Sequence, residues 1–246
     1  MSKALWNILQ KAENQLDIYL YDDIEGDSYD WWTGEVQESE TSAKHIQKVL
    51  ESTPNAAQIN LYINSYGGEV KEGLGIFNQL QRHPAQKTAY IDGFACSIAS
   101  VIAMACNNVI MGPNSLMMIH HASLYAYGNS EQLRKAANDL DVIDKASCSS
   151  YLMKAGDKLD ENKLNELLDN QTWLSAEECF KYGLCDQITG KENNIIEEAK
   201  QQYKSFITQH MNNKAPLPKV PQQFINQKNN YEILRQKFIK KSEDDK

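Results

Sequence analysis

The chain has 246 residues, a formal net charge of −8 and a hydrophobic content of 41%. This length suits one ordinary domain plus an appendage, or two small domains, and the hydrophobic content is sufficient to build a core. The acidic balance, with a pI of about 5.2, disfavours broad nucleic-acid binding, since a phosphate backbone selects a basic surface. The longest mostly apolar run, residues 94–106, is too short to span a bilayer. We therefore expect neither a nucleic-acid partner nor a membrane partner.

Cysteine usage and the first residues indicate the compartment. The five cysteines show no CxxC pairing and no zinc-like spacing, and an odd number without a framework fits a reducing environment. Residues 1–10 contain no long apolar core and no cleavage signature. The acidic stretch from Glu13 to Glu40 is typical of a solvated face, and its segment Asp22-Asp23-Ile24-Glu25-Gly26-Asp27 lacks the spacing and the terminal Glu of a calcium loop. We expect a cytoplasmic protein with no metal and no other cofactor.

The first half of the chain alternates strand and helix patterns. Runs rich in β-formers predict strands at residues 16–21, 59–63, 88–91, 109–111 and 116–119. A turn-rich acidic loop with Trp31 and Trp32 follows the first of these strands. Helical periodicity predicts helices at 41–50 and 70–80, and an apolar, buried helix begins at about Ser97. This order predicts the repeated crossover units of an α/β fold.

The second half is mainly helical. A long amphipathic helix is expected over residues 131–153, a second helix over 161–168, and a third over 175–182. Ser175 can cap the third helix and Gly183 can end it. After Gly190 the composition shifts to Lys, Gln, Asn and Glu. We expect a folded domain over residues 1–190. The remainder, 191–246, is expected to be a polar, partly disordered tail with short helices, either inert or used for docking.

Ser97 and the Gly67-Gly68 pair suggest acyl-transfer chemistry. Such chemistry needs a nucleophile, a base, a group that orients the base, and donors for the developing oxyanion. Ser97 lies at a strand-to-helix corner, where it is either a nucleophile or simply the cap of the helix. Gly67-Gly68 allows a sharp turn that presents an N–H without a side chain in the way, and the Ile98 N–H is a second candidate donor. A plain glycine turn is the alternative.

His120 is the candidate base because it closes the apolar strand 116–119. A histidine in such a place can also be a satisfied core or edge residue. His121 follows directly, and neighbours on a strand point to opposite faces, so only one of the two can face Ser97.

These segments occur in the order found in the Clp-protease proteolytic subunit (ClpP). The segments are Ile63-Asn64-Ser65-x-Gly67-Gly68, Gly93 to Ser100, Met118-Ile119-His120, and Trp173-Leu174-Ser175-Ala176-Glu177-Glu178 through Tyr182-Gly183-Leu184-x-Asp186. The chain resembles this family over about residues 5–190. It is most similar to the phage prohead-protease-like branch, with which it shares Gln171-Thr172-Trp173 and the helix start at residues 129–133.

The resemblance implies a ClpP/crotonase-like fold of repeated strand-strand-helix units with a protruding handle helix from Glu131. It implies a serine endopeptidase that works in a homo-oligomeric ring on peptide or protein substrates. Ser97 is then the nucleophile, His120 the base, and Gly68 with Ile98 the oxyanion hole. An AAA+ unfoldase and phage capsid or scaffold proteins are the candidate partners, the latter as substrates of a maturation protease.

The chain departs from the family pattern at two positions. Tyr66 stands where the family usually has proline, although both following glycines remain. Gln171 stands where the family carries the carboxylate of the triad, and an amide cannot offset the charge that forms on the imidazole. In serine-protease triads this exchange lowers kcat about 10⁴-fold. Asp169 lies two residues earlier and could reach His120 if residues 169–173 are extended, but not if the helix continues through it. We therefore predict Asp169 as the third member, with Gln171 or a bridging water as the alternative.

Two other functions use the same fold. A crotonase acting on acyl-CoA also relies on backbone N–H groups, but it needs no Ser–His pair. A catalytically weakened or inactive subunit that assembles or regulates a partner is the third possibility, and Gln171 is the feature that favours it.

Overall fold

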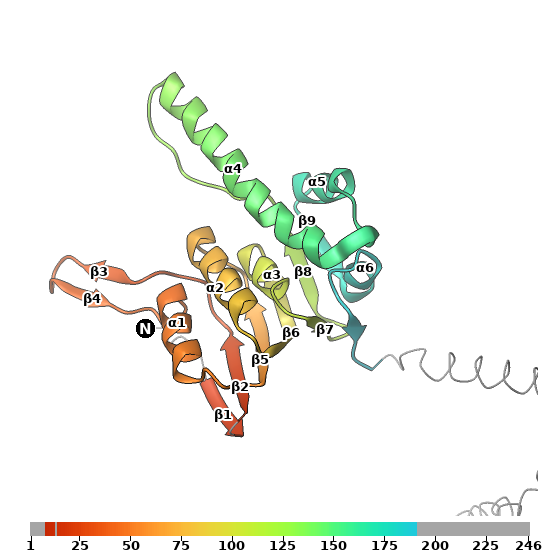
Figure 1. Ribbon diagram of the computed structural model, residues 1–246. Helices are drawn as coiled ribbons and strands as arrows, with labels where there is room; N and C mark the ends of the chain where they lie inside the picture. The colour runs from red at the N-terminus through yellow and green to blue at the C-terminus, as the bar shows by residue number, and fades with distance from the viewer. Residues whose placement is uncertain (1–7, 13, 191–246) are drawn as a thin grey trace, which may run out of the picture. The chain divides into compact units, whose positions relative to one another are not determined.

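A computed structural model describes residues 8–12 and 14–190 of the chain. Figure 1 shows these residues as a twisted sheet with helices packed over it and one long helix, α4, that extends away from it. The predicted tail, residues 191–246, lies outside the described residues.

The main sheet has eight strands and is mostly parallel, which confirms the predicted α/β class. Its continuous path runs in the order β1-β2-β5-β6-β7-β10. The bounds on this path are β1 (Ile8–Ala12), β2 (Gln15–Leu20), β5 (Gln58–Ser65), β6 (Gln86–Cys96), β7 (Asn108–Met111) and β10 (Gln187–Ile188). All neighbours on the path are parallel except β1 and β2. The central strands mix buried apolar residues with buried polar ones, among them Asp17, Asn60 and Lys87.

Strand β6 is much longer than the sequence predicts, because it pairs with different partners along its length. Its first half lies between β5 and β7. Its second half, residues 94–96, pairs with β8 (Leu116–Ile119), which in turn pairs antiparallel with β9 (Thr172–Ser175). This branching brings the ends of β6 and β8 together, with Cys96 opposite Met118.

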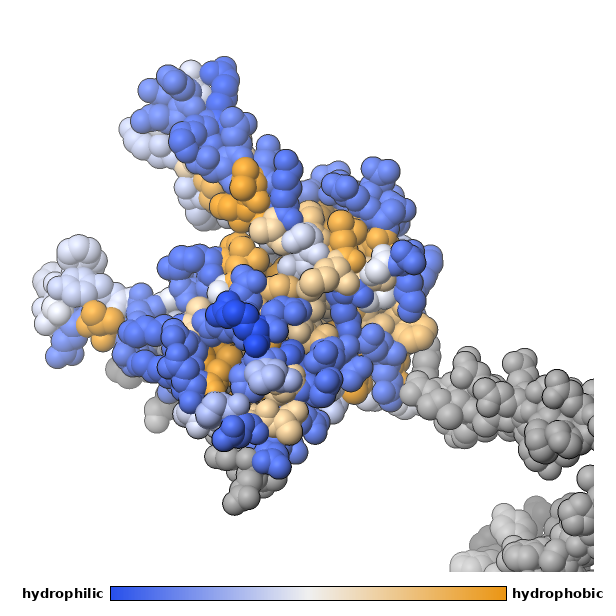
Figure 2. Space-filling view, in the orientation of Figure 1, coloured by the Kyte–Doolittle hydropathy of each residue, from blue (hydrophilic) through white to orange (hydrophobic). Residues whose placement is uncertain are grey.

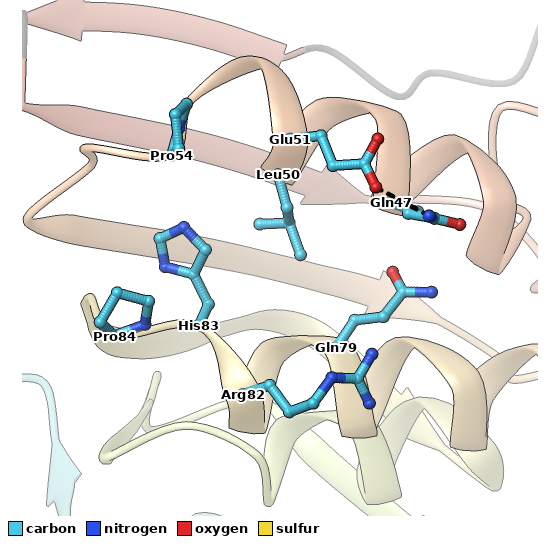
Figure 3. A pocket seen from close by; sticks show the side chains of 8 residues that line it. All are labelled: Gln47, Leu50, Glu51, Pro54, Gln79, Arg82, His83 and Pro84. Atoms are coloured by element: carbon cyan, nitrogen blue, oxygen red, sulfur yellow. Dashed lines mark hydrogen bonds between the residues drawn. The ribbon is translucent and has the colours of Figure 1, made fainter.

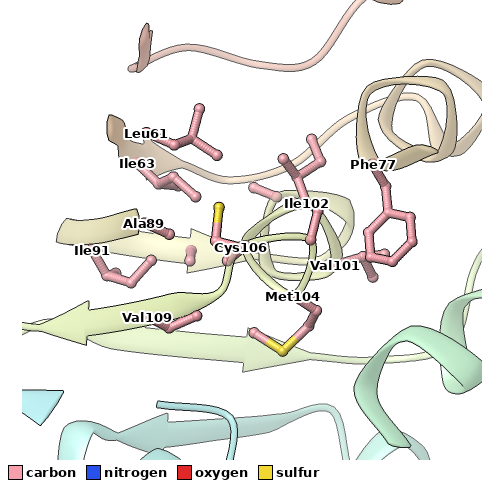
Figure 4. Packing of buried hydrophobic residues seen from close by; sticks show 14 of the residues in the cluster. Leu61, Ile63, Phe77, Ala89, Ile91, Val101, Ile102, Met104, Cys106 and Val109 are labelled. Atoms are coloured by element: carbon pink, nitrogen blue, oxygen red, sulfur yellow. The ribbon is translucent and has the colours of Figure 1, made fainter. Parts of the chain in front are cut away.

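Six α-helices and one short 3₁₀ helix accompany the sheet among the described residues. They are α1 (Ala43–Ser52), α2 (Val70–Arg82), α3 (Ile98–Ala103), α4 (Ser130–Ala155), η1 (Gly156–Lys158), α5 (Glu161–Asp169) and α6 (Ala176–Lys181). All six residues of α3 are buried. Figure 4 shows its Val101 and Ile102 packed among Leu61, Ala89 and Phe77. The apolar run of the sequence therefore forms the centre of the core, as predicted.

Helix α4 is buried only near its C-terminal end, at Ser150, Tyr151 and Ala155. An Asn129 capping box fixes its start. Apolar residues of its N-terminal two-thirds are exposed, with Leu133 at 43% and Val142 at 67%. Figure 2 shows apolar side chains gathered where α4 approaches the body of the domain. The protruding handle helix implied by the resemblance is thus present.

The segment predicted as an acidic loop contains a small hairpin instead. Strands β3 (Ser28–Asp30) and β4 (Glu35–Gln37) pair antiparallel, separate from the main sheet. Asp30 Oδ1 accepts the N–H groups of Trp32 and Thr33 and so builds the turn, where Trp31 and Trp32 are almost fully exposed. Strands of three residues are too short for an alternating pattern to reveal them.

None of the described helices is both long enough and apolar enough to span a membrane.

Candidate active site

Ser97 stands at a sharp corner between β6 and α3. Its φ of 53° and ψ of −129° place a non-glycine residue in a strained conformation that costs on the order of 1–3 kcal/mol. Its N–H is bonded to the Met118 carbonyl at 2.8 Å, which ties the corner to β8. The Ser97 side chain makes no capping bond to α3. Ser97 thus occupies the N-cap position of α3, but its hydroxyl does not cap the helix and faces His120 instead.

His120 follows the last residue of β8 and faces that hydroxyl. Its Nε2 lies 2.8 Å from Ser97 Oγ. Burial lowers the pKa of His120 below its ordinary value of 6.5, and the charge of His121 acts in the same direction, while the Asp144 carboxylate opposes both. A neutral imidazole that is hydrogen-bonded to a hydroxyl is equipped to accept its proton.

Gly67 and Gly68 form a tight turn against the Ser97 corner and the β2–β3 connection. Both have positive φ, 104° and 145°. A Cβ at Gly67 would lie 2.8 Å from both the Cys96 carbonyl oxygen and Ser97 Cβ, and one at Gly68 would lie 2.1 Å from the Ile24 carbonyl oxygen. Only glycine permits this approach.

The turn leaves backbone N–H groups available beside Ser97. A parallel bridge to Ile24 uses the Gly67 carbonyl and the Glu69 N–H, so the Gly68 N–H takes no part in it. Ile98 is the first residue of α3, and its N–H is among those that have no partner inside the helix. Both donors predicted for an oxyanion thus lie next to the Ser97 corner.

A cleft of about 610 Å³ opens at this place. The Gly67-Gly68 turn and the start of α2 line one side of the cleft. Leu124, Leu140 and Ile143, from the loop after β8 and from α4, add apolar surface, while Asp23, Glu25 and Glu69 add carboxylates. Ser97 and His120 are not among the lining residues of the cleft, which reaches the site through Gly67, Gly68 and Ala122.

The predicted contact between Asp169 and His120 does not form. Asp169 is the last residue of α5 and a turn separates it from β9, so residues 169–173 are not extended throughout and the condition for that contact fails. Its Oδ1 lies 3.0 Å from Nε2 of His121 instead, and its side chain is 72% exposed. Gln171 occupies the turn between α5 and β9 with φ of +47°, and it is exposed.

Asp144 is the residue near the site that sequence reasoning missed. Its Oδ1 accepts the Ala122 N–H at 2.6 Å, and its Oδ2 lies 2.9 Å from Nδ1 of His121. Asp144 sits on α4 within a helical stretch dense with charge, where nothing in the local pattern separates it from solvated neighbours such as Asp141. Only the packing of α4 against the segment after β8 singles it out.

A second cavity, of about 450 Å³, lies between α1 and α2 (Figure 3). Leu50, Pro54 and Pro84 form its apolar part, and Gln47 and Glu51 are hydrogen-bonded to each other at its edge. None of its lining residues belongs to the segments that carry Ser97, His120 or Gly68.

A mostly parallel α/β sheet that carries a Ser–His pair beside a glycine turn is the arrangement that the resemblance to Clp proteases implies. Comparison with known proteins agrees, because residues 31–192 match the model of the family described as Clp protease. The chain therefore belongs to the Clp protease family. It shares the ClpP-type fold of that family.

Three relatives indicate the degree of similarity. The chain is 31% identical to ATP-dependent Clp protease proteolytic subunit 1 of Salinibacter ruber, over 58% of this chain and 62% of that protein. It is 33% identical to the corresponding subunit of Deinococcus radiodurans, over 61% and 74%. It is 27% identical to that of Ligilactobacillus salivarius, over 76% and 96%. The match thus spans somewhat less than two thirds of the first relative and nearly all of the last.

Proposed function

We propose that this chain is a serine endopeptidase in which Ser97 is the nucleophile and His120 the general base. The observation that carries the proposal is the 2.8 Å separation between Ser97 Oγ and His120 Nε2. It is supported by the strained corner that turns Ser97 away from α3 and by the cleft that opens beside it.

The chemistry proceeds in two halves. His120 Nε2 takes the proton of Ser97 as Oγ attacks the peptide carbonyl, and the N–H groups of Gly68 and Ile98 hold the oxyanion. His120 then gives the proton to the leaving amine, and an acyl-enzyme remains on Ser97. Water repeats the sequence and releases the second product. Loss of one oxyanion donor typically costs 10²–10³ in kcat.

Replacing Ser97 with alanine tests the proposal directly. The Ser97→Ala protein should lose peptide cleavage and lose labelling by a serine-reactive fluorophosphonate, because the attacking oxygen is gone. Ser52→Ala is the matched control: Ser52 is an exposed serine at the end of α1 that bonds only to the Val49 carbonyl. It should retain both properties. Equal labelling of wild type and Ser97→Ala would reject Ser97 as the nucleophile.

We also propose that the active form is a homo-oligomeric ring. The support is the exposed apolar surface of α4 together with the handle role that the family resemblance gives to this helix. An ATP-driven unfoldase on a separate chain is the proposed partner, since the relatives are named ATP-dependent subunits. Phage capsid or scaffold proteins remain candidate substrates, on the strength of the resemblance at residues 129–133 and 171–173 alone.

The second candidate is a weakened or inactive subunit that assembles or regulates. The neutral Gln171 and the diversion of Asp169 to His121 favour it. An Asp169→Asn exchange tests the predicted role of Asp169: unchanged activity, together with loss of activity in Gln171→Ala, would reject Asp169 as the third member. A wild-type protein that assembles but neither cleaves peptides nor reacts with a fluorophosphonate would establish the inactive subunit.

A further inference from the structure

The Ser97–His120 pair lacks an evident carboxylate partner. A serine peptidase needs a group that orients the imidazole and stabilises the charge formed on it. Within residues 14–190, the His120 imidazole forms its side-chain hydrogen bond with the Ser97 hydroxyl, through Nε2. Asp169 is engaged by His121, and Gln171 is uncharged and exposed. Whatever supports His120 must therefore come from another element.

Asp144 on α4 contacts both residues that follow His120. One carboxylate oxygen accepts the Ala122 N–H at 2.6 Å, and the other lies 2.9 Å from Nδ1 of His121. The Asp144 side chain is only 17% exposed, so water screens it weakly. A short bond to backbone and a contact to the adjacent ring fix the position of the segment that carries His120.

The charge of Asp144 also acts on His120 itself. Among the charged groups around this imidazole, Asp144 is the one that raises the pKa of His120, against the effects of burial and of His121. The groups that face the segment are His121 beside it, Asp144 on α4 and Asp169 on α5. Asp169 is largely exposed, so solvent screens its charge.

We infer that Asp144 is the positioning residue of the proposed peptidase. It holds the 120–122 segment so that His120 faces Ser97, and it supplies the negative charge that Gln171 does not. This inference rests on the proposed function of Ser97 and His120. It also makes α4 part of the catalytic apparatus, because one helix then carries both the exposed handle surface and the carboxylate behind the base.

Asp144→Asn tests the inference. The amide oxygen can still accept the Ala122 N–H, so the exchange removes the charge and keeps an acceptor. We expect kcat for a peptide substrate to fall about 10-fold or more with little change in KM, because the lost interaction acts on the transition state. The acidic limb of the kcat/KM profile should move to lower pH, since removing a nearby negative charge lowers the pKa of His120.

Asp141→Asn is the matched control. Asp141 lies on the same helix, is exposed and undergoes the same loss of charge without touching the 120–122 segment. It should leave both kcat and the acidic limb unchanged. A purely structural role for Asp144 would lower the melting temperature without moving the acidic limb. An Asp144→Asn protein whose profile equals that of Asp141→Asn would overturn the inference.

Two further measurements keep the outcome decisive. If Asp144→Asn does not fold, Asp144→Glu replaces it, because it keeps the charge and displaces it by one methylene. For this variant kcat should fall while the acidic limb of the pH profile stays in place. A kcat equal to that of the wild type would refute the positioning role. A titration of the ¹⁵N-labelled imidazole of His120 needs no activity. An unchanged midpoint in Asp144→Asn would refute the inference, whereas a wild type without serine reactivity would refute the proposed function alone.

Discussion

At the scale of single residues, the site is defined by backbone conformations that cost free energy. Ser97 adopts a positive φ although it carries a side chain, and Gly67 leaves it the room to do so. Such strain persists only where the surrounding structure enforces it, and it is concentrated at functional sites. Here β6, β8 and the glycine turn enforce it together, and the result is an accessible Oγ within reach of His120.

Gly67→Ala should therefore damage the site more than the fold. The added Cβ would lie 2.8 Å from both the Cys96 carbonyl oxygen and Ser97 Cβ, so the Ser97 corner has to shift. We expect kcat/KM to fall at least 10²-fold, because a displacement of about 1 Å near the chemistry has effects of that size. Steady-state cleavage of a fluorogenic peptide is the measurement.

The control for this exchange is Gly156→Ala. Gly156 also has a positive φ, 57°, but a Cβ there would meet nothing within 4 Å. Gly156→Ala shares the strain of a positive φ with Gly67→Ala but not the close contact with neighbouring atoms. It should therefore lose about 1 kcal/mol of stability and keep its activity. Equal losses of activity in the two variants would show that strain alone, and not contact with Ser97, explains the effect.

At the scale of elements, the sequence predicts most of the fold because periodicity is a local property. The strands at 59–63 and 116–119 and the helices at 41–50 and 70–80 are confirmed with bounds shifted by a few residues. The extent of β6 was missed, since its second half depends on pairing with β8, which is not written in the local pattern.

The candidate site was predicted, up to its third member, only when the order of its motifs along the chain was read together with the family resemblance. Ser97, His120 and the glycine turn lie at corners that local composition marks. The role assigned to Asp169 depended on whether residues 169–173 are helical or extended, and α5 continues through Asp169. Asp144 could not be found, because its importance arises from the packing of α4 on the segment after β8.

The contact between α3 and α4 gives a prediction at this scale. The Ser100 hydroxyl donates to the Ser97 carbonyl at 2.5 Å, so the buried Tyr151 hydroxyl, 2.6 Å away, must donate to Ser100. Tyr151→Phe should leave a buried oxygen with one donor fewer and cost about 1–2 kcal/mol. For a domain of this size the melting temperature should drop by about 2–8 °C.

Calorimetry on Tyr151→Phe and Tyr90→Phe separates this bond from the general effect of removing a hydroxyl. Tyr90 is half-buried in the sheet and stacks on Tyr62. Its phenylalanine variant should stay within about 0.5 kcal/mol of wild type, as is usual away from special contacts. A Tyr151→Phe protein as stable as Tyr90→Phe would show that the hydrogen bonds from Tyr151 through Ser100 to the Ser97 carbonyl contribute nothing measurable to stability.

At the scale of the whole molecule, the described domain has a buried core and one long helix, α4, whose apolar side chains are left exposed in the single chain. Helix α3 and the described central strands supply most of the buried core, whereas Leu133 and Val142 of α4 are exposed. Exposed apolar surface of this kind on a regular helix marks an interface. From the resemblance to Clp proteases, we propose that further copies of the chain cover this surface.

Glutamates in place of the exposed apolar residues of α4 should therefore dissociate the proposed ring. In the double variant Leu133→Glu, Val142→Glu, each contact between copies would bury carboxylates without partners, which costs several kcal/mol per site. Sedimentation velocity should show a shift from the large assembly to smaller species. The same variant should retain its fold, because neither side chain is buried in the chain itself.

Asn138→Glu provides the control, since it places the same side chain at an exposed polar position of α4. It should assemble like wild type. Peptide cleavage by the dissociated double variant then reports whether α4 must be packed against a neighbour for Asp144 to hold His120 in place. If the double variant keeps the mass of the assembly but cleaves less, the loss of activity comes from the change in α4 itself. If it keeps both the mass and full activity, α4 is rejected as the interface between copies.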